Sequence, residues 1–153
     1  MKTKYLLIII VLLYSCTGKV NEQRKQDLAA LIIQTIEKEN IDDKENQLYL
    51  FVADYMCVEC VVKEYMNIKN EGIPIDLIGV FDSKRNFAAS AGTASVKNKI
   101  FINRREQNIN NIPVQPFYFI YNKKTKTISE VFYPAACEEG KTISYFQKVK
   151  KLI

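Results

Sequence analysis

Two cysteines separated by two residues are the clearest chemical signal in this sequence, which reads Cys57-Val58-Glu59-Cys60 at this point. Two thiols that can bond to each other exchange two electrons with the disulfide of a partner. If the pair opens a helix, this spacing brings the sulfurs within bonding reach, and the helix N-terminus stabilises a thiolate at the first position. The pattern predicts that Cys57 attacks and that Cys60, one turn deeper, resolves the mixed disulfide.

The other reactive side chains narrow the chemistry. The chain has four cysteines, no histidine and no tryptophan, so Ser-His and Cys-His triads and the commonest zinc and copper sites are excluded. A structural zinc site needs four such ligands, and no metal site is predicted. Cys137 is either an accessory thiol, able to trap the mixed disulfide or to bond Cys57, or a small half-buried hydrophobe.

The first fifteen residues have the three parts of an export signal. Lys2 and Lys4 precede the apolar run Tyr5–Tyr14, and the small Ser15 follows it. A bilayer core takes roughly twenty apolar residues, so this run is too short to span a membrane, and we expect it to be removed.

Leu13-Tyr14-Ser15-Cys16 resembles a bacterial lipobox. The resemblance implies that Cys16 becomes the N-terminus and carries acyl chains such as palmitate, which anchor the protein to a membrane facing the periplasm or the exterior. The alternative is an ordinary secretory signal that leaves Cys16 as a free thiol. Either way, the chain would reach a compartment of the cell envelope in which cysteines can pair.

Length and charge indicate one globular domain. We expect a signal over residues 1–15, a tether over 16–21 and a single domain over 22–153, because about 100 to 200 residues make one domain. Twenty-two basic residues face 17 acidic ones, for a net charge of +5. This balance predicts no nucleic-acid partner, which would require a clustered basic face.

Apolar patterning predicts helices alternating with strands. A strand, a helix and a strand in succession would form a right-handed unit with parallel strands. The stretch 82–111 is less regular, and we expect a helix within Ser83–Ser95 there, with Lys99–Ile102 as a candidate short strand. The other expected elements are helices over Glu22–Glu39, Cys57–Asn70 and Lys141–Ile153, buried strands over Leu48–Ala53 and Ile75–Phe81, and a hairpin of Phe117–Tyr121 with Thr127–Tyr133.

This order of elements, with the cysteine pair opening a helix and Gln115-Pro116 directly before the hairpin, resembles the thioredoxin superfamily, especially its membrane-anchored extracytoplasmic members. The resemblance implies an α/β three-layer fold: a central mixed sheet of about four strands flanked by helices, here with an extra N-terminal helix. It also implies that Pro116 is cis and packs against the cysteines, while Gln115 offers a backbone edge to the substrate. The alternative is a trans proline that opens a strand, which strands tolerate.

The implied activity is thiol-disulfide exchange on exported proteins that contain cysteines, with a membrane or envelope thiol protein as electron donor and no bound cofactor. Met56 replaces the aromatic residue that usually precedes the first cysteine, and Phe51 replaces a buried acid. Glu59 disfavours a nearby thiolate, which favours a reductase or isomerase over an oxidase. The rival interpretation is a redox-inactive thioredoxin-like lipoprotein that serves as a membrane-tethered binding or scaffold module. A copper-delivery role lacks the histidine ligand and the longer cysteine spacing of such relatives.

Overall fold

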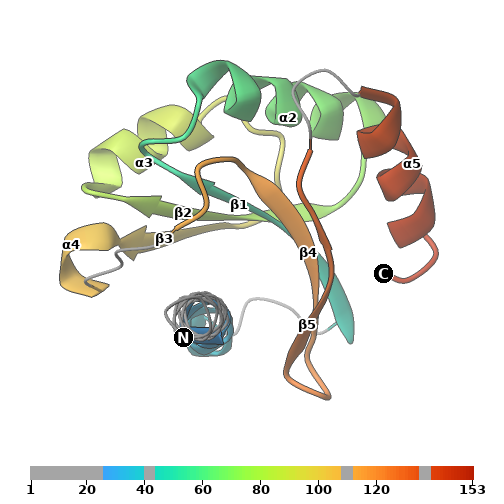
Figure 1. The fold of residues 1–153 in the computed structure, drawn as a ribbon, viewed down its shortest axis with the longest axis horizontal. Helices are drawn as coiled ribbons and strands as arrows, with labels where there is room; N and C mark the ends of the chain where they lie inside the picture. Colours follow the sequence, from blue (N-terminus) through green and yellow to red (C-terminus); the bar gives the residue numbers. More distant parts are fainter. Residues whose placement is uncertain (1–25, 40–43, 108–111, 135–138) are drawn as a thin grey trace, which may run out of the picture.

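The computed structural model describes residues 26–39, 44–107, 112–134 and 139–153 (Figure 1). The described residues form one five-stranded mixed sheet in the order β3-β2-β1-β4-β5. Strands β3, β2 and β1 run parallel, and β4 runs antiparallel to both of its neighbours, β1 and β5. The sheet therefore has one strand more than the four expected. The strands are β1 (Asn46–Ala53), β2 (Ile75–Phe81), β3 (Lys99–Asn103), β4 (Phe117–Asn122) and β5 (Thr127–Phe132).

The two strands predicted to be buried lie in the middle of this sheet. Every residue of β2, and every residue of β1 from Gln47 to Ala53, is buried. An uninterrupted apolar run suits a strand that is covered on both faces, so their central position follows from composition. The candidate strand Lys99–Ile102 is also present, as the edge strand β3.

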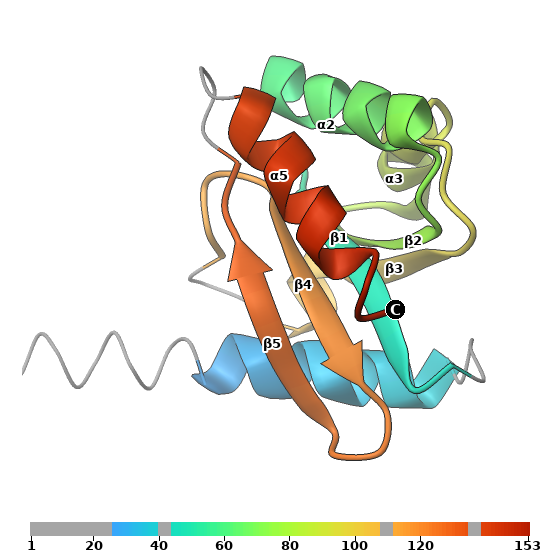
Figure 2. The ribbon, with the colours of Figure 1, turned by 90° about the vertical axis from the view of Figure 1, so that its right-hand side faces the viewer.

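Helices cover both faces of the sheet. Figures 1 and 2 show α2 (Val58–Glu71), α3 (Lys84–Ala91) and α5 (Glu139–Val149) on one face, and the helix over residues 26–39 on the other. The chain moves from β1 to β2 to β3 in one direction across the sheet. Right-handed crossovers then place α2 and α3 on the same face. The short α4 (Arg104–Gln107) follows β3 directly and was not predicted.

Aromatic side chains fill the core on the α2 side. The ring of Tyr118 on β4 lies 5.8 Å from that of Tyr145 and 5.1 Å from that of Phe146, both on α5. At Gly79 on β2, an added Cβ would clash with the ring of Phe87 on α3. The absence of a side chain at this position therefore allows α3 to pack directly on the sheet.

The opposite face has its own aromatic layer. Tyr49 stacks on Phe119 with ring centroids 5.3 Å apart, and Phe51 stacks on Phe117 at 4.7 Å. The helix over residues 26–39 adds the buried Ile32 and Ile36 to the same core. Leu28, Leu31, Ile32 and Ile36 recur at three- and four-residue spacing, which predicts one apolar stripe, and this stripe is the packing face of the helix.

The helix ends match the predictions only in part. Gly72 ends α2 with a left-handed conformation, φ 60°, in which a residue without a side chain is favoured. The last helix ends at Val149 rather than Ile153. The spacing of Ile143, Phe146, Val149 and Leu152 predicts one buried face for this helix. Ile143 is 40% exposed, because the buried stripe runs through Thr142, Tyr145, Phe146 and Val149, and Leu152, beyond the end of the helix, is 42% exposed. No helix within the described ranges is both long and apolar enough to cross a bilayer.

Candidate functional site

A tight turn after β1 positions the first cysteine. The Met56 N–H donates to the Ala53 carbonyl and the Ala53 N–H donates to Met56 Sδ, both at 3.1 Å. Met56 is buried beneath the turn. The residue that stands where an aromatic side chain is usual therefore acts as the anchor of the loop that leads into α2.

Cys57 occupies the N-cap position of α2. Its Sγ accepts a hydrogen bond from the Cys60 N–H at 3.3 Å. Both cysteines are free thiols, with Cys57 exposed and Cys60 half-buried. The structure thus brings the pair together at the start of a helix, with the first thiol outside and the second behind it, as the spacing predicts.

The pKa values of the two thiols are shifted in opposite directions. A hydrogen bond from the Cys60 thiol, followed by the Cys60 N–H, lowers the pKa of Cys57 below its ordinary value. The same hydrogen bond, followed by burial, raises the pKa of Cys60. A backbone hydrogen bond from Glu59 also lowers the pKa of Cys57, whereas the charge of Glu59 raises it as the smallest of the effects. The exposed thiol is therefore the more acidic of the two.

Gln115 and Pro116 lie at the same edge of the sheet as the cysteines. Phe117, the next residue, pairs with Phe51 near the carboxyl end of β1, from which the turn leads to Cys57. Gln115 is exposed and Pro116 is buried. The described residues contain no cis peptide bond, so the expectation of a cis Pro116 was wrong. A trans bond is favoured by about 0.5–1 kcal/mol before proline, and proline is tolerated at the start of a strand.

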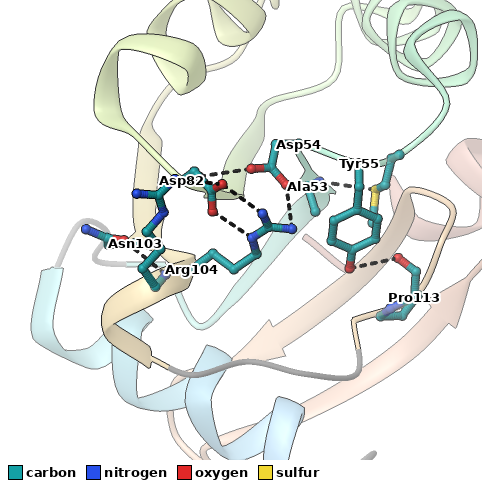
Figure 3. A network of polar contacts seen from close by, with 9 residues as sticks. Ala53, Asp54, Tyr55, Asp82, Asn103, Arg104 and Pro113 are labelled. Atoms are coloured by element: carbon teal, nitrogen blue, oxygen red, sulfur yellow. Dashed lines mark hydrogen bonds and ion pairs between the residues drawn. The ribbon is translucent and has the colours of Figure 1, made fainter.

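Tyr55 connects the loop before Cys57 with the segment before Pro116. Its hydroxyl donates to the Pro113 carbonyl at 3.5 Å, and the guanidinium carbon of Arg104 lies 5.7 Å from its ring centre. Burial raises the pKa of Tyr55 to about 12. In Figure 3 its side chain spans the space between the two segments, so one residue couples both parts of the candidate site.

An ionic cluster of Asp54, Asp82 and Arg104 lies beside Tyr55 (Figure 3). Arg104 Nε and Nη2 donate to the two carboxylate oxygens of Asp82 at 2.7 and 2.8 Å, and Nη1 lies 3.3 Å from Asp54 Oδ1. The Asp82 N–H donates to Asp54 Oδ2 at 3.0 Å. The Arg104 hydrogen bonds lower the pKa of Asp82.

Sequence reasoning missed this cluster, although a signal was present. Asp54 follows β1, Asp82 follows β2 and Arg104 follows β3. The carboxyl ends of adjacent parallel strands meet at one edge of a sheet, so charged residues directly after successive strands are expected to lie close together.

Two predicted site residues, Cys16 and Cys137, lie outside the described residues. Within the described part of the chain, no group of three or more cysteine, aspartate or glutamate side chains could hold a metal ion. No family model matches the chain, and no curated protein matches it.

Proposed function

We propose that this protein is a thiol-disulfide oxidoreductase with a thioredoxin-like fold. The proposal is carried by one observation: an exposed Cys57 thiol with a lowered pKa lies at the N-cap of α2 and accepts a hydrogen bond from the N–H of the half-buried Cys60, one turn into the helix. The strand-helix-strand unit before an antiparallel hairpin, with Pro116 at the same sheet edge, is consistent with that fold.

The proposed reaction proceeds in two exchanges. The Cys57 thiolate attacks one sulfur of the substrate disulfide, forms a mixed disulfide and releases the other substrate sulfur, which takes a proton from water. The Cys60 thiol loses its proton and attacks Cys57, so that the second substrate sulfur leaves and is protonated in turn. The substrate gains two electrons and two protons, and the pair is left as a Cys57–Cys60 disulfide. Another thiol protein then reduces this disulfide to the two thiols and is itself oxidised to a disulfide.

The charge of Glu59 is our reason to propose a reductase or isomerase. A strongly oxidising pair requires a very acidic first cysteine, whose stable thiolate favours the reduced form. The negative charge of Glu59 works against such a thiolate. We therefore place the pair among the thiol donors.

The surroundings of Cys57 suit a polypeptide substrate. Val58 and Val114 are 73% and 77% exposed, and Tyr55 is also exposed. Val58 directly follows Cys57, and Val114 follows Pro113, whose carbonyl accepts the Tyr55 hydrogen bond. We propose that the exposed Gln115 offers its backbone to an extended chain. We propose exported proteins with cysteines as substrates. We further propose that Cys16 carries a lipid anchor at the cell envelope, where a membrane thiol donor would regenerate the pair.

Reduction of insulin by dithiothreitol, followed by turbidity, tests the activity. The full-length chain in detergent should accelerate precipitation above the rate with dithiothreitol alone. Cys57→Ser should reduce this acceleration at least about 100-fold, because a serine hydroxyl at neutral pH is a far weaker nucleophile than a thiolate. Val62→Ser, an exposed position on the same helix, is the matched control and should retain the wild-type rate.

The rival interpretation makes the opposite forecast. A redox-inactive binding module would give the same background rate with wild type and Cys57→Ser. Cys60→Ser sharpens the distinction, because an active pair without its resolving thiol should accumulate a mixed disulfide with insulin on non-reducing gels. The enzymatic proposal is rejected if the wild type does not accelerate precipitation and Cys60→Ser does not accumulate a mixed disulfide.

A further inference from the structure

Lysines gather at the end of the molecule opposite the cysteine pair. β1 runs from Asn46 to Ala53 and leads to Cys57, so at roughly 3.3 Å per residue it holds its two ends roughly 23 Å apart. The first residue of the strand connects two other segments: Asn46 Nδ2 donates to the Leu152 carbonyl at 2.8 Å, and Asn122 Nδ2 donates to Asn46 Oδ1 at 2.7 Å. The β4–β5 turn and the C-terminal segment therefore lie side by side at this end.

Three segments bring exposed lysines to this end. They are the β4–β5 turn, the segment around the end of α5, and the last turn of α2, which is joined to the C-terminal segment by an ion pair of 3.2 Å between Lys150 Nζ and Glu71 Oε2. In Figure 2, α2 begins at the upper left, whereas the β4–β5 turn and the C-terminus lie lower and to the right. The sequence did not predict this cluster, because its members are far apart in the chain. All six are exposed, and we call them the lysine pole: Lys69, Lys123, Lys124, Lys126, Lys150 and Lys151.

Nearby glutamates offset only part of this charge. Besides Glu71, which is paired as described, Glu37 Oε1 lies 2.8 Å from Lys126 Nζ. Glu45 is also at this end, since its carbonyl accepts the Lys123 N–H at 2.8 Å. Within the described residues, the six lysines outnumber these three carboxylates, so the lysine pole carries an excess of positive charge.

The chemistry of the lysine pole differs from that of a nucleic-acid site. Such sites combine arginine forks with exposed aromatic rings on which bases stack. The described arginines, Arg85, Arg104 and Arg105, follow β2 or β3 at the cysteine end. The exposed aromatic residues of the described chain lie there too, since Tyr55 is in the loop before the cysteines and Tyr133 contacts the start of β4.

Lysines beside an exposed apolar residue suit the surface of an anionic membrane. Lysine is a flexible, hydrated point charge, which attracts anionic headgroups without requiring a fixed geometry. Leu152, next to Lys151, is 42% exposed and can contact the apolar boundary beneath the headgroups. We propose that the lysine pole docks on a surface of anionic phospholipid headgroups and holds Cys57 away from that surface, toward its substrates. This inference goes beyond the proposed function, because it does not require any chemistry at Cys57.

The first test maps which face of the protein meets the membrane. The full-length chain is diluted from detergent onto vesicles of phosphatidylcholine, either alone or with phosphatidylglycerol, and a water-soluble amine-reactive ester labels its lysines for mass spectrometry. On the anionic vesicles, Lys123, Lys124 and Lys151 should react at least about threefold more slowly than on the neutral ones, because headgroup contacts cover their amines. Lys84 and Lys141, exposed near the starts of α3 and α5, should react equally on both. Salt at about 1 M, which shortens the screening length to about 3 Å, should remove the difference.

Two matched variants test the affinity. Lys123→Gln with Lys124→Gln removes two adjacent charges from the lysine pole, and Lys84→Gln with Arg85→Gln removes two adjacent exposed charges from α3. The measured quantity is the ratio of the partition coefficients for anionic and neutral vesicles, which cancels binding that both lipids share, such as that of the apolar run Tyr5–Tyr14. The ratio should fall at least about tenfold in the first variant, because each lysine near an anionic surface contributes about fivefold. It should stay within about twofold of the wild type in the second, whose charges lie away from the lysine pole.

Three results would overturn the inference. The lysine pole could be labelled at the same rate on both kinds of vesicle. The two variants could lower the ratio equally, which would assign the attraction to net charge alone. Duplex DNA could slow the labelling of the lysine pole and displace the vesicles, which would assign this surface to a nucleic acid. None of these outcomes involves Cys57, so the proposed function is decided separately by the insulin assay.

Discussion

Two polar clusters share one edge of the sheet, and their side chains are used in opposite ways. At the start of α2, the exposed Cys57 sulfur receives hydrogen bonds while it keeps a free side toward solvent. In the ionic cluster, Arg104 donates hydrogen bonds to both carboxylate oxygens of Asp82 and forms an ion pair with Asp54 (Figure 3). Both clusters lower the pKa of an acidic group, Cys57 in one and Asp82 in the other.

The difference shows what makes a perturbed acid reactive. Asp82 is a weak base and its oxygens are occupied by a bidentate partner, so its charge holds chain segments together. Cys57 is stabilised by the helix start, and its sulfur can still meet a substrate. We therefore expect changes in the ionic cluster to act mainly on stability and changes around Cys57 to act mainly on reactivity.

Of the changes proposed for the two clusters, loss of Arg104 should have the largest effect, and this effect should be on stability. Arg104→Gln would leave the carboxylates of Asp54 and Asp82 close together without their shared cation, and partly buried like charges disfavour the folded state. We expect a clear fall in the midpoint of urea unfolding. Arg105→Gln is the matched control, because Arg105 is more exposed and its Nη2 lies 3.5 Å from Asp82 Oδ2. Equal falls for the two variants would contradict a bracing role for Arg104.

The second-largest effect is expected in the pH dependence of stability, to which Asp82 of the ionic cluster should contribute. The pKa of Asp82 is lower in the folded protein than its ordinary value of 3.8. Its contribution to stability is therefore present above pH 3.8 and is lost as pH falls through the lowered value. Urea unfolding of Asp82→Asn should show a shallower loss of stability below that pH than the wild type. Curves that run parallel would mean that Asp82 titrates no differently in the folded chain.

The smallest change is expected at the cysteine pair. Glu59→Gln removes a negative charge that raises the pKa of Cys57, so thiolate should form at lower pH, with a change in alkylation rate of about twofold, typical of exposed charges. Titration of thiolate ultraviolet absorbance in both proteins measures the shift. A wild-type pKa near that of strongly oxidising pairs, roughly 3.5, would refute the assignment as a thiol donor, and an unchanged value in Glu59→Gln would show that Glu59 does not act on Cys57.

The two regions also differ in how far the sequence predicted them. The cysteine pair is local, because four consecutive residues and the helical pattern after them place both sulfurs. Arg104 and Asp82 are 22 residues apart, and their meeting depends on β2 and β3 being adjacent. The trans state of Pro116 was missed for a related reason: the free-energy difference between isomers is small, so the surrounding structure selects one of them.

Periodicity and composition sufficed for the central strands, the helix that Cys57 begins and the hairpin, because each of these follows from short-range spacing of apolar and turn residues. The spacing of the two cysteines at the start of a helix likewise predicted that Cys57 is the more exposed thiol. The sheet order, the ionic cluster and the contacts of Asn46 that assemble the lysine pole required the folded chain. Those contacts join residues distant in sequence, and their free energies depend on which strands pair and which groups lose their water.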